Sequence, residues 1–178
     1  MKKVLLTLLV ALACSLTASA QDVFVKGDKV FHAGLGFGSY LGETGASSLT
    51  PPVLVSGEYG ITDALLSNGK GYVGLGGYLA YSADEYKFSG YKYKCTNVIV
   101  GARGAFHYQF VDKLDTYAGV MLGYNAASID DKNLDLSYGG FTHSSFVGAR
   151  YYFTDKIGAF GEIGYGIAAL ELGVAIKF

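Results

Sequence analysis

The chain has 178 residues, and its 14 basic and 15 acidic side chains nearly balance. This balance excludes the strongly basic surface that nucleic-acid binding requires. Hydrophobic residues make up 51% of the chain, mean hydropathy is +0.29, and the sequence contains 26 glycines, 15 tyrosines and 11 phenylalanines. A secreted chain of this composition either buries its apolar side chains in a soluble β core or presents them to lipid.

The first residues have the pattern of a secretory signal peptide. Two lysines precede an apolar run at 4–13, which is too short to span a bilayer, and a small-x-small motif follows. We therefore expect a cleaved signal peptide at 1–20 and one mature domain at 21–178. The residues of the expected cleavage site are Ala18, Ala20 and Gln21.

Removal of that segment changes the charge and the cysteine count. The mature chain keeps 12 basic and 15 acidic side chains, because Lys2 and Lys3 are lost, and its net charge is 12 − 15 = −3. Cys95 is then the one remaining cysteine, so an internal disulfide is excluded. A lipoprotein signal acylated at Cys14 is the alternative, but Ala11 stands where a leucine is usual.

Eight segments of the mature chain alternate in hydropathy with period two, which is typical of β-strands. In chain order they lie at 29–40, 53–61, 71–82, 94–110, 115–127, 141–153, 157–167 and 169–178. Long connections at 41–52, 83–93 and 128–140 are expected to be outer loops, and short ones at 111–114 and 154–156 inner turns. The connection at 62–70 is long for an inner turn, and the last outer loop, near 168, is almost absent.

The two faces of each predicted strand differ in composition. In the last strand, Leu172 and Val174 alternate with Glu171, Gly173 and Lys177, and the fourth, third and sixth strands repeat this arrangement. One face is apolar, whereas the other holds the glycines and nearly all of the charge. A soluble barrel would show water a face rich in charged residues and threonine. We therefore expect the apolar face to meet lipid and the glycine-rich face to line a crowded interior.

Three stretches, at 100–108, 148–153 and 161–166, together with the C-terminal Phe178, resemble the small eight-stranded outer-membrane barrels of the OmpA/OmpX-like superfamily. The resemblance covers the whole mature chain. It implies an all-β fold, an eight-stranded antiparallel up-and-down transmembrane β-barrel in the outer membrane of a Gram-negative-type cell. The assembly signal that it implies consists of Leu172, Val174, Ile176 and Phe178.

The same resemblance implies partners. Outer-membrane lipid and lipopolysaccharide would surround the barrel, and the barrel-assembly machinery and periplasmic chaperones would meet it during biogenesis. A host or cell-surface ligand would bind at the outer loops, because loops on a rigid scaffold carry recognition. We expect a monomer, and no nucleic-acid partner.

Strand parity places one group of charged side chains inside the barrel. Arg103 and Arg150 can meet Glu58 and Glu162 across a narrow lumen. Eight strands leave little more room than side chains fill, and buried charges must be paired. We therefore expect a polar plug rather than an ion path. The predicted lumenal group is Glu58, Arg103, His107, Arg150, Glu162, Glu171 and Lys177, with His32 and Tyr117 nearby.

His143 and Ser145 face outward near the outer rim, as the catalytic pair of a lipid A deacylase built on a small barrel would. No outward acid follows to orient the imidazole, so the triad is incomplete. No motif indicates a metal or another cofactor. We expect a non-enzymatic barrel with a structural or surface-interaction role. A lipid-modifying enzyme and a soluble periplasmic lipocalin-like ligand carrier are the alternatives.

Overall fold

The computed structural model describes residues 23–38, 46–88, 91–131 and 134–178. The predicted signal peptide and its cleavage-site residues Ala18, Ala20 and Gln21 lie outside these ranges. No helix in the described part of the chain is long and apolar enough to cross a membrane.

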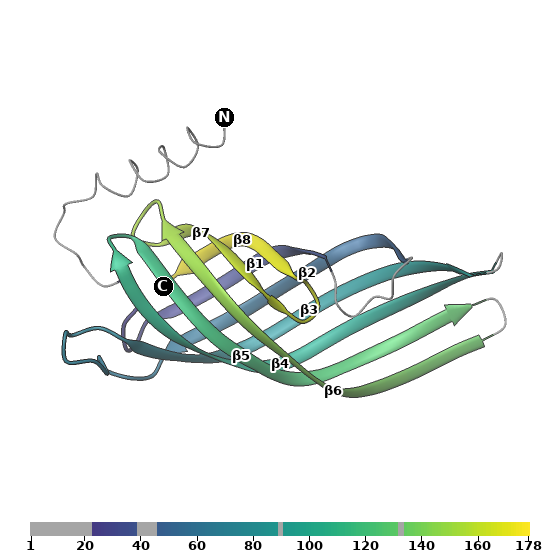
Figure 1. Ribbon diagram of the computed structural model, residues 1–178, viewed down its shortest axis with the longest axis horizontal. Helices are drawn as coiled ribbons and strands as arrows, with labels where there is room; N and C mark the ends of the chain where they lie inside the picture. Colours follow the sequence, from purple (N-terminus) through teal and green to yellow (C-terminus); the bar gives the residue numbers. More distant parts are fainter. Residues whose placement is uncertain (1–22, 39–45, 89–90, 132–133) are drawn as a thin grey trace.

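Eight antiparallel strands form one closed barrel in which each strand pairs with its neighbours in the sequence and β8 returns to β1 (Figure 1). The strands are β1 (Lys29–Phe37), β2 (Ala46–Gly60), β3 (Tyr72–Phe88), β4 (Tyr91–Val111), β5 (Leu114–Asp131), β6 (Leu134–Tyr152), β7 (Ile157–Tyr165) and β8 (Leu170–Lys177). The predicted all-β, up-and-down, eight-stranded barrel is confirmed. Closure removes the unpaired edges that an open sheet of these strands would expose.

Side chains alternate between the interior and the outside along every wall of the barrel. In β4, Arg103, Ala105 and His107 are buried, whereas Val100 and Phe106 are exposed. In β3, Tyr78 and Ala80 are buried and Leu75 and Leu79 are exposed. The predicted assignment of the two faces is therefore confirmed: the glycine-rich face with the charges points inward and the apolar face points outward.

The strands differ greatly in length. β1, β7 and β8 have 9, 9 and 8 residues, whereas β3 to β6 have 17, 21, 18 and 19. The prediction that 83–93 and 128–140 are loops was wrong. Most of these residues extend β3 to β6 as two hairpins beyond the ends of the short strands β1, β7 and β8 (Figure 1). Strands without a hydrophobic interior need no apolar alternation, so the sequence pattern fades there although the pairing continues.

We call these extensions, together with the first residues of β2, the projecting sheet. Among the described residues, each of its two margins has a paired strand on one side only. β2 pairs with β1 from Val53 onward, so the backbone of 46–52 is paired in that part of the chain with β3 only. β6 pairs with β7 from Ser145 onward, so the backbone of 134–144 is paired there with β5 only. We call the end of the barrel with the projecting sheet the outer end. The opposite end, with the β2–β3, β4–β5 and β6–β7 turns, is called the inner end.

Candidate functional site

The interior of the barrel is filled by side chains, and Arg150 is at the centre of a polar layer. Its guanidinium is fully buried and donates to the Asp115 carboxylate through Nε and Nη2. Its Nη1 donates to Glu58 Oε2 at 3.1 Å and lies 3.2 Å from His32 Nε2. One arginine thus bridges two carboxylates that enter the lumen from β2 and β5.

His107 joins the same two carboxylates from the other side. Its Nε2 lies 2.8 Å from Glu58 Oε1, and its Nδ1 lies 3.0 Å from Asp115 Oδ2. Both ring nitrogens lie within hydrogen-bond distance of a carboxylate oxygen, and Arg150 Nη2 also lies 3.0 Å from Nδ1. The two acids, the arginine and the histidine therefore form one compact ion cluster.

Arg103 and Glu162 form a second buried ion pair, with Arg103 Nη2 donating to Glu162 Oε1 at 2.8 Å. The Tyr117 hydroxyl donates to the same oxygen at 2.8 Å. Arg103 also donates to Ser56 Oγ at 3.3 Å, and its guanidinium lies 4.2 Å from the centre of the Phe146 ring. Such multiple contacts are what allow a buried charge to be tolerated.

Glu171 is directly opposite Glu162 in the β7–β8 register, and no basic side chain of the described residues forms a salt bridge with it. Tyr78 donates its hydroxyl to Glu171 Oε1 at 2.8 Å. Glu171 and Arg103 both line a cavity of about 20 Å³ that reaches the β7–β8 turn. This volume has room for roughly one water molecule.

Interior glycines make room for these large polar groups. A Cβ on Gly74 would lie 2.5 Å from Glu58 Oε1, and a Cβ on Gly148 would lie 2.7 Å from the Tyr117 ring and 2.8 Å from Glu162 Cγ. A larger residue would displace Glu58 at the first position and Tyr117 or Glu162 at the second. The glycine pattern in the sequence and the charged interior are therefore two aspects of the same packing.

The N-terminal segment closes the lumen at its inner end. Phe24 is buried and stacks on the His107 ring at 3.9 Å between centroids. Val23 donates its backbone N–H to Gln109 Oε1 at 2.8 Å. Lys177 Nζ lies 2.7 Å from Asp28 Oδ2 and donates to the Val23 carbonyl at 3.1 Å. Lys177 thus holds this inner closure and does not contact the central ion cluster that the sequence predicted it to join.

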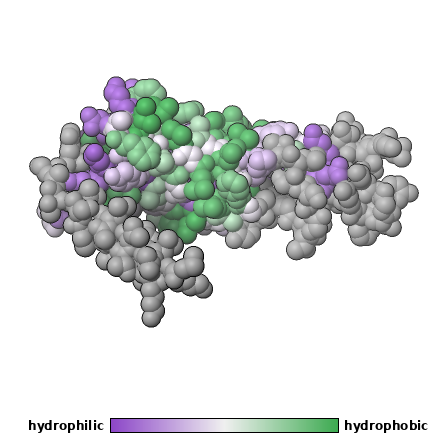
Figure 2. All heavy atoms as spheres, turned by 90° about the horizontal axis from the view of Figure 1, so that it is seen from above, coloured by the Kyte–Doolittle hydropathy of each residue, from purple (hydrophilic) through white to green (hydrophobic). Residues whose placement is uncertain are grey.

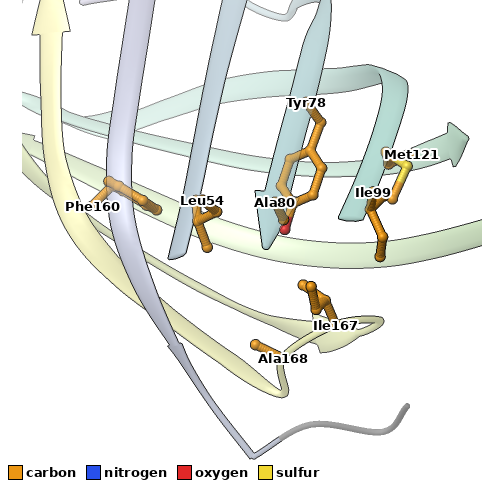
Figure 3. Packing of buried hydrophobic residues seen from close by; sticks show 8 residues of the cluster. All are labelled: Leu54, Tyr78, Ala80, Ile99, Met121, Phe160, Ile167 and Ala168. Atoms are coloured by element: carbon orange, nitrogen blue, oxygen red, sulfur yellow. The ribbon is translucent and has the colours of Figure 1, made fainter. Parts of the chain in front are cut away.

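A second, apolar closure is present at the outer end, where the short β7–β8 turn folds into the barrel mouth. Figure 3 shows Ile167 and Ala168 of this turn near Leu54, Ile99 and Met121, and all five are buried. The sequence analysis missed this layer. Leu54 and Ile99 share parity with interior positions, so the signal was present, but it was outweighed by the glycines and charges on the same face.

Asp115 was also missed, although it contacts both Arg150 and His107. It stands one residue after the start of β5, where an acidic residue reads as part of the preceding turn. The available signal was its parity with Tyr117, which the sequence had placed beside the lumen. Of the predicted lumenal residues, the structure brings Glu58, Arg103, His107, Arg150, Glu162 and Glu171 into the interior, and it also places His32 and Tyr117 there.

His143 and Ser145 both face outward and are exposed. The His143 ring lies between Phe141 and Tyr165, at 6.1 and 5.9 Å between centroids. Within the described ranges, no hydrogen bond joins His143 to Ser145 and no acid forms a salt bridge with His143. His143 is therefore next to aromatic side chains, and the pair lacks the contact between base and nucleophile that hydrolases have.

The outside of the barrel carries a band of exposed apolar side chains. Figure 2 shows hydrophobic residues gathered over the middle of one face, with hydrophilic residues toward the inner end. Tyr59, Tyr151, Phe153 and Phe178 are exposed aromatic residues of the inner end. The C-terminal residues Leu172, Val174, Ile176 and Phe178 are all exposed on this outer surface, and β8 closes against β1.

No group of three or more histidine, cysteine or acidic side chains in the described part of the chain has the geometry of a metal site.

No family model and no curated protein matches this sequence. Solved structures do match its fold. Ail, the attachment invasion locus protein of Yersinia pestis, solved alone and with the heparin analogue sucrose octasulfate, gives TM-scores of 0.54 and 0.55 at 10% identity, covering 86% of this chain and 100% of Ail. The N-terminal β-barrel domain of Pseudomonas aeruginosa OprF gives 0.54 at 18% identity, covering 86% of this chain and 98% of the domain. This chain therefore has the eight-stranded barrel fold of Ail and of the OprF N-terminal domain.

Proposed function

We propose that the protein is an integral outer-membrane barrel with a sealed interior, and that its projecting sheet serves surface interaction. The observation that carries this proposal is the inverted polarity of the barrel. Its buried side chains include Arg103, Arg150 and Glu162, whereas Leu79, Val100 and Leu122 are about half exposed on the outside. Lipid favours such a surface, and a closed barrel leaves no backbone group unpaired within the hydrocarbon.

The two margins of the projecting sheet, each paired with one strand among the described residues, support one orientation. Unpaired backbone N–H and C=O groups cannot lie in hydrocarbon without a large cost. The margins at 46–52 and 134–144 therefore lie outside the bilayer, beyond the level at which β1 and β7 end. The first strand begins at Lys29 and the last strand ends at Lys177, and both residues lie at the inner end. With this end toward the periplasm, the projecting sheet faces the cell exterior.

Filling of the lumen supports a structural barrel over a pore or a ligand carrier. Phe24 closes the inner end, the ion cluster occupies the middle, and Ile167 and Ala168 close the outer end. The cavity of about 20 Å³ beside Glu171 is far smaller than the roughly 300–1,000 Å³ of small-molecule sites. We expect no steady conductance in planar bilayers, and stepwise openings of the wild-type protein would contradict the sealed interior.

The β6 margin is the better candidate for a partner. The β2 margin contains Pro51 and Pro52, where the β2–β3 register shifts, and proline blunts an edge because it cannot donate a backbone hydrogen bond. On the β6 margin, Gly139 and Gly140 are followed by Phe141, whose side chain is 73% exposed. An extended segment of a host or cell-surface protein could add to this margin as a further strand.

Cys95 offers a test of location and orientation. It is in the outer part of β4, and burial raises the pKa of its thiol, so labelling works best at mildly alkaline pH. A membrane-impermeant maleimide is expected to label Cys95 on intact cells. In the matched variant Cys95→Ser with Asp155→Cys in the β6–β7 turn, labelling should require disruption of the outer membrane. The reverse pattern, or a soluble periplasmic fraction holding most of the protein, would overturn the proposal.

A comparison of adhesion tests the interaction role. Residues 85–88 pair with 91–94 at the outer end of the β3–β4 hairpin, and Asp84 and Cys95 are the next paired partners toward the barrel. Replacing 85–94 by Asn-Gly, the preferred two-residue hairpin turn, should keep the barrel and shorten the sheet. Cells that produce the shortened protein should adhere to host-cell layers less than cells that produce the full one. Equal adhesion at equal surface amounts would argue for a purely structural role.

A further inference from the structure

The β2–β3 turn at the inner end, residues 61–71, differs from the other two inner turns. The β4–β5 turn contains Asp112 and Lys113, and the β6–β7 turn contains Asp155 and Lys156, as expected for turns in water. The β2–β3 turn also has two charged residues, Asp63, which pairs with Lys26, and Lys70. In addition it carries Leu65 and Leu66, whose side chains are 56% and 43% exposed. Exposed leucines distinguish this turn from the other two.

This turn is a small ordered hairpin rather than an irregular loop. Leu65 N donates to Gly71 O at 2.8 Å, and Leu66 N donates to Lys70 O at 2.8 Å. Gly69, with φ of 76°, closes the tip, and its N–H donates to Leu66 O at 3.0 Å. Backbone groups paired in this way can enter an apolar medium at little cost, which open turns cannot.

The hairpin lies against the outer wall of the barrel. A Cβ added to Gly71 would lie 2.9 Å from Phe106 Cζ and 3.0 Å from Leu66 Cγ, so Leu66 and Phe106 meet over this glycine. Asn68 Nδ2 donates to the Tyr108 hydroxyl at 3.1 Å, and Lys70 Nζ lies 5.7 Å from the centre of the Tyr108 ring. Phe106 belongs to the exposed apolar face, so the two leucines continue the lipid-facing band.

We propose that residues 61–71 form a lipid-binding foot, which inserts Leu65 and Leu66 into the inner, periplasmic leaflet of the membrane beside the barrel wall. This inference rests on the proposed membrane location. Tyr108 and Lys70 mark the headgroup level, because tyrosine and lysine are the side chains that favour a membrane interface. The foot also explains why this inner turn is long where inner turns of such barrels are short.

The natural sequence contains no tryptophan, so a single introduced tryptophan reports on one position. We would refold Leu65→Trp into phosphatidylcholine vesicles with and without brominated acyl chains, which quench fluorescence on contact. Asp155→Trp, in another inner turn, is the matched control for a turn in water. Leu79→Trp, on the exposed face of β3, reports on the barrel wall. Heat-modifiable migration on gels would verify that each variant is folded.

For Leu65→Trp we expect blue-shifted emission and quenching, strongest with lipids brominated near the headgroup. Asp155→Trp should emit as in water and stay unquenched. If Leu79→Trp is quenched but Leu65→Trp behaves as Asp155→Trp, the foot is overturned while the membrane barrel stands, and a periplasmic protein becomes the candidate occupant. If Leu79→Trp is itself unquenched in folded protein, the proposed membrane location fails as well.

Discussion

The same four strands, β3 to β6, pass through two regions of the molecule that follow different rules. In the barrel body, every strand has two neighbours, one face packs on Arg150, Ile167 and their partners, and the other face is apolar. In the projecting sheet, the outer parts of β2 and β6 each pair with one strand only among the described residues. Stability is therefore concentrated in the body, whereas the projecting sheet has freedom to vary in sequence.

The largest expected contrast between the two regions comes from removing one charge in each. Arg150→Ala leaves Glu58 and Asp115 buried without their arginine, which should lower the free energy of unfolding by about 3–5 kcal/mol. Lys94→Ala removes the same charge from an exposed position on the projecting part of β4 and should change it by less than about 0.5 kcal/mol. Urea unfolding in lipid vesicles measures both, and equal losses would show that the lumenal cluster is not a structural unit.

A pair of apolar truncations sharpens the comparison. Ile167→Ala opens a cavity in the outer closure of the lumen, where Ile167 is 3% exposed, and should cost about 2–5 kcal/mol. Phe141→Ala removes a larger side chain from the β6 margin and should leave the unfolding free energy nearly unchanged, because that ring is mostly in contact with solvent. The same urea titration measures both variants. A larger loss of unfolding free energy for Phe141→Ala than for Ile167→Ala would contradict the assignment of the stabilising core to the barrel body.

Within the body, the two opposed acids should respond in opposite directions. Glu162→Gln takes the charged partner from Arg103 and should destabilise the barrel. Glu171→Gln relieves the repulsion between two carboxylates that face each other across β7 and β8, so it should stabilise by about 0.5 kcal/mol. Thermal unfolding followed by heat-modifiability would resolve the sign. Destabilisation by both variants would mean that Glu171 has a partner that matters as much as Arg103 does to Glu162.

The smallest effect on the body is expected from shortening the projecting sheet. When Asn-Gly replaces residues 85–94, the lumen and all β1, β7 and β8 pairings stay intact. The urea midpoint of the body should therefore remain close to that of the full chain. A collapse of the barrel after this change would show that the projecting sheet and the body fold as one unit.

Much of the barrel could be predicted because its two faces meet different media. Successive side chains of a strand point to opposite faces, so parity alone assigned Arg103 and His107 to the inside and Phe106 to the outside. The strand ends on the outer side could not be predicted, since polar residues such as Asp84 and Ser128 continue the strand pairing there, Asp84 opposite Cys95 and Ser128 opposite Thr96. Hydrogen bonding continues there without leaving a trace in hydropathy.

The sequence predicted which residue types line the candidate site, but not which of them lie at the same level and pair with one another. Buried arginines and acids on one face implied pairing, yet the sequence could not show that Arg150 serves Glu58 and Asp115 while Arg103 serves Glu162. That choice depends on the slant of the strands around the barrel, which sets which interior positions share a level. The Phe24 and Ile167 closures come from segments outside the strands, to which parity does not apply.

The unequal height of the barrel wall has a consequence for the surrounding bilayer. The eight residues of β8, at about 3.3 Å each and a tilt of about 40°, reach only about 20 Å, whereas the apolar band of such barrels is about 25 Å tall. In the membrane location proposed above, the bilayer around β7 and β8 would therefore have to become thinner, or the whole protein would have to lean toward its short side. Either response is a form of hydrophobic mismatch, and it favours thin membranes over thick ones. The short strands β7 and β8 would thus make the stability of the inserted protein depend on membrane thickness.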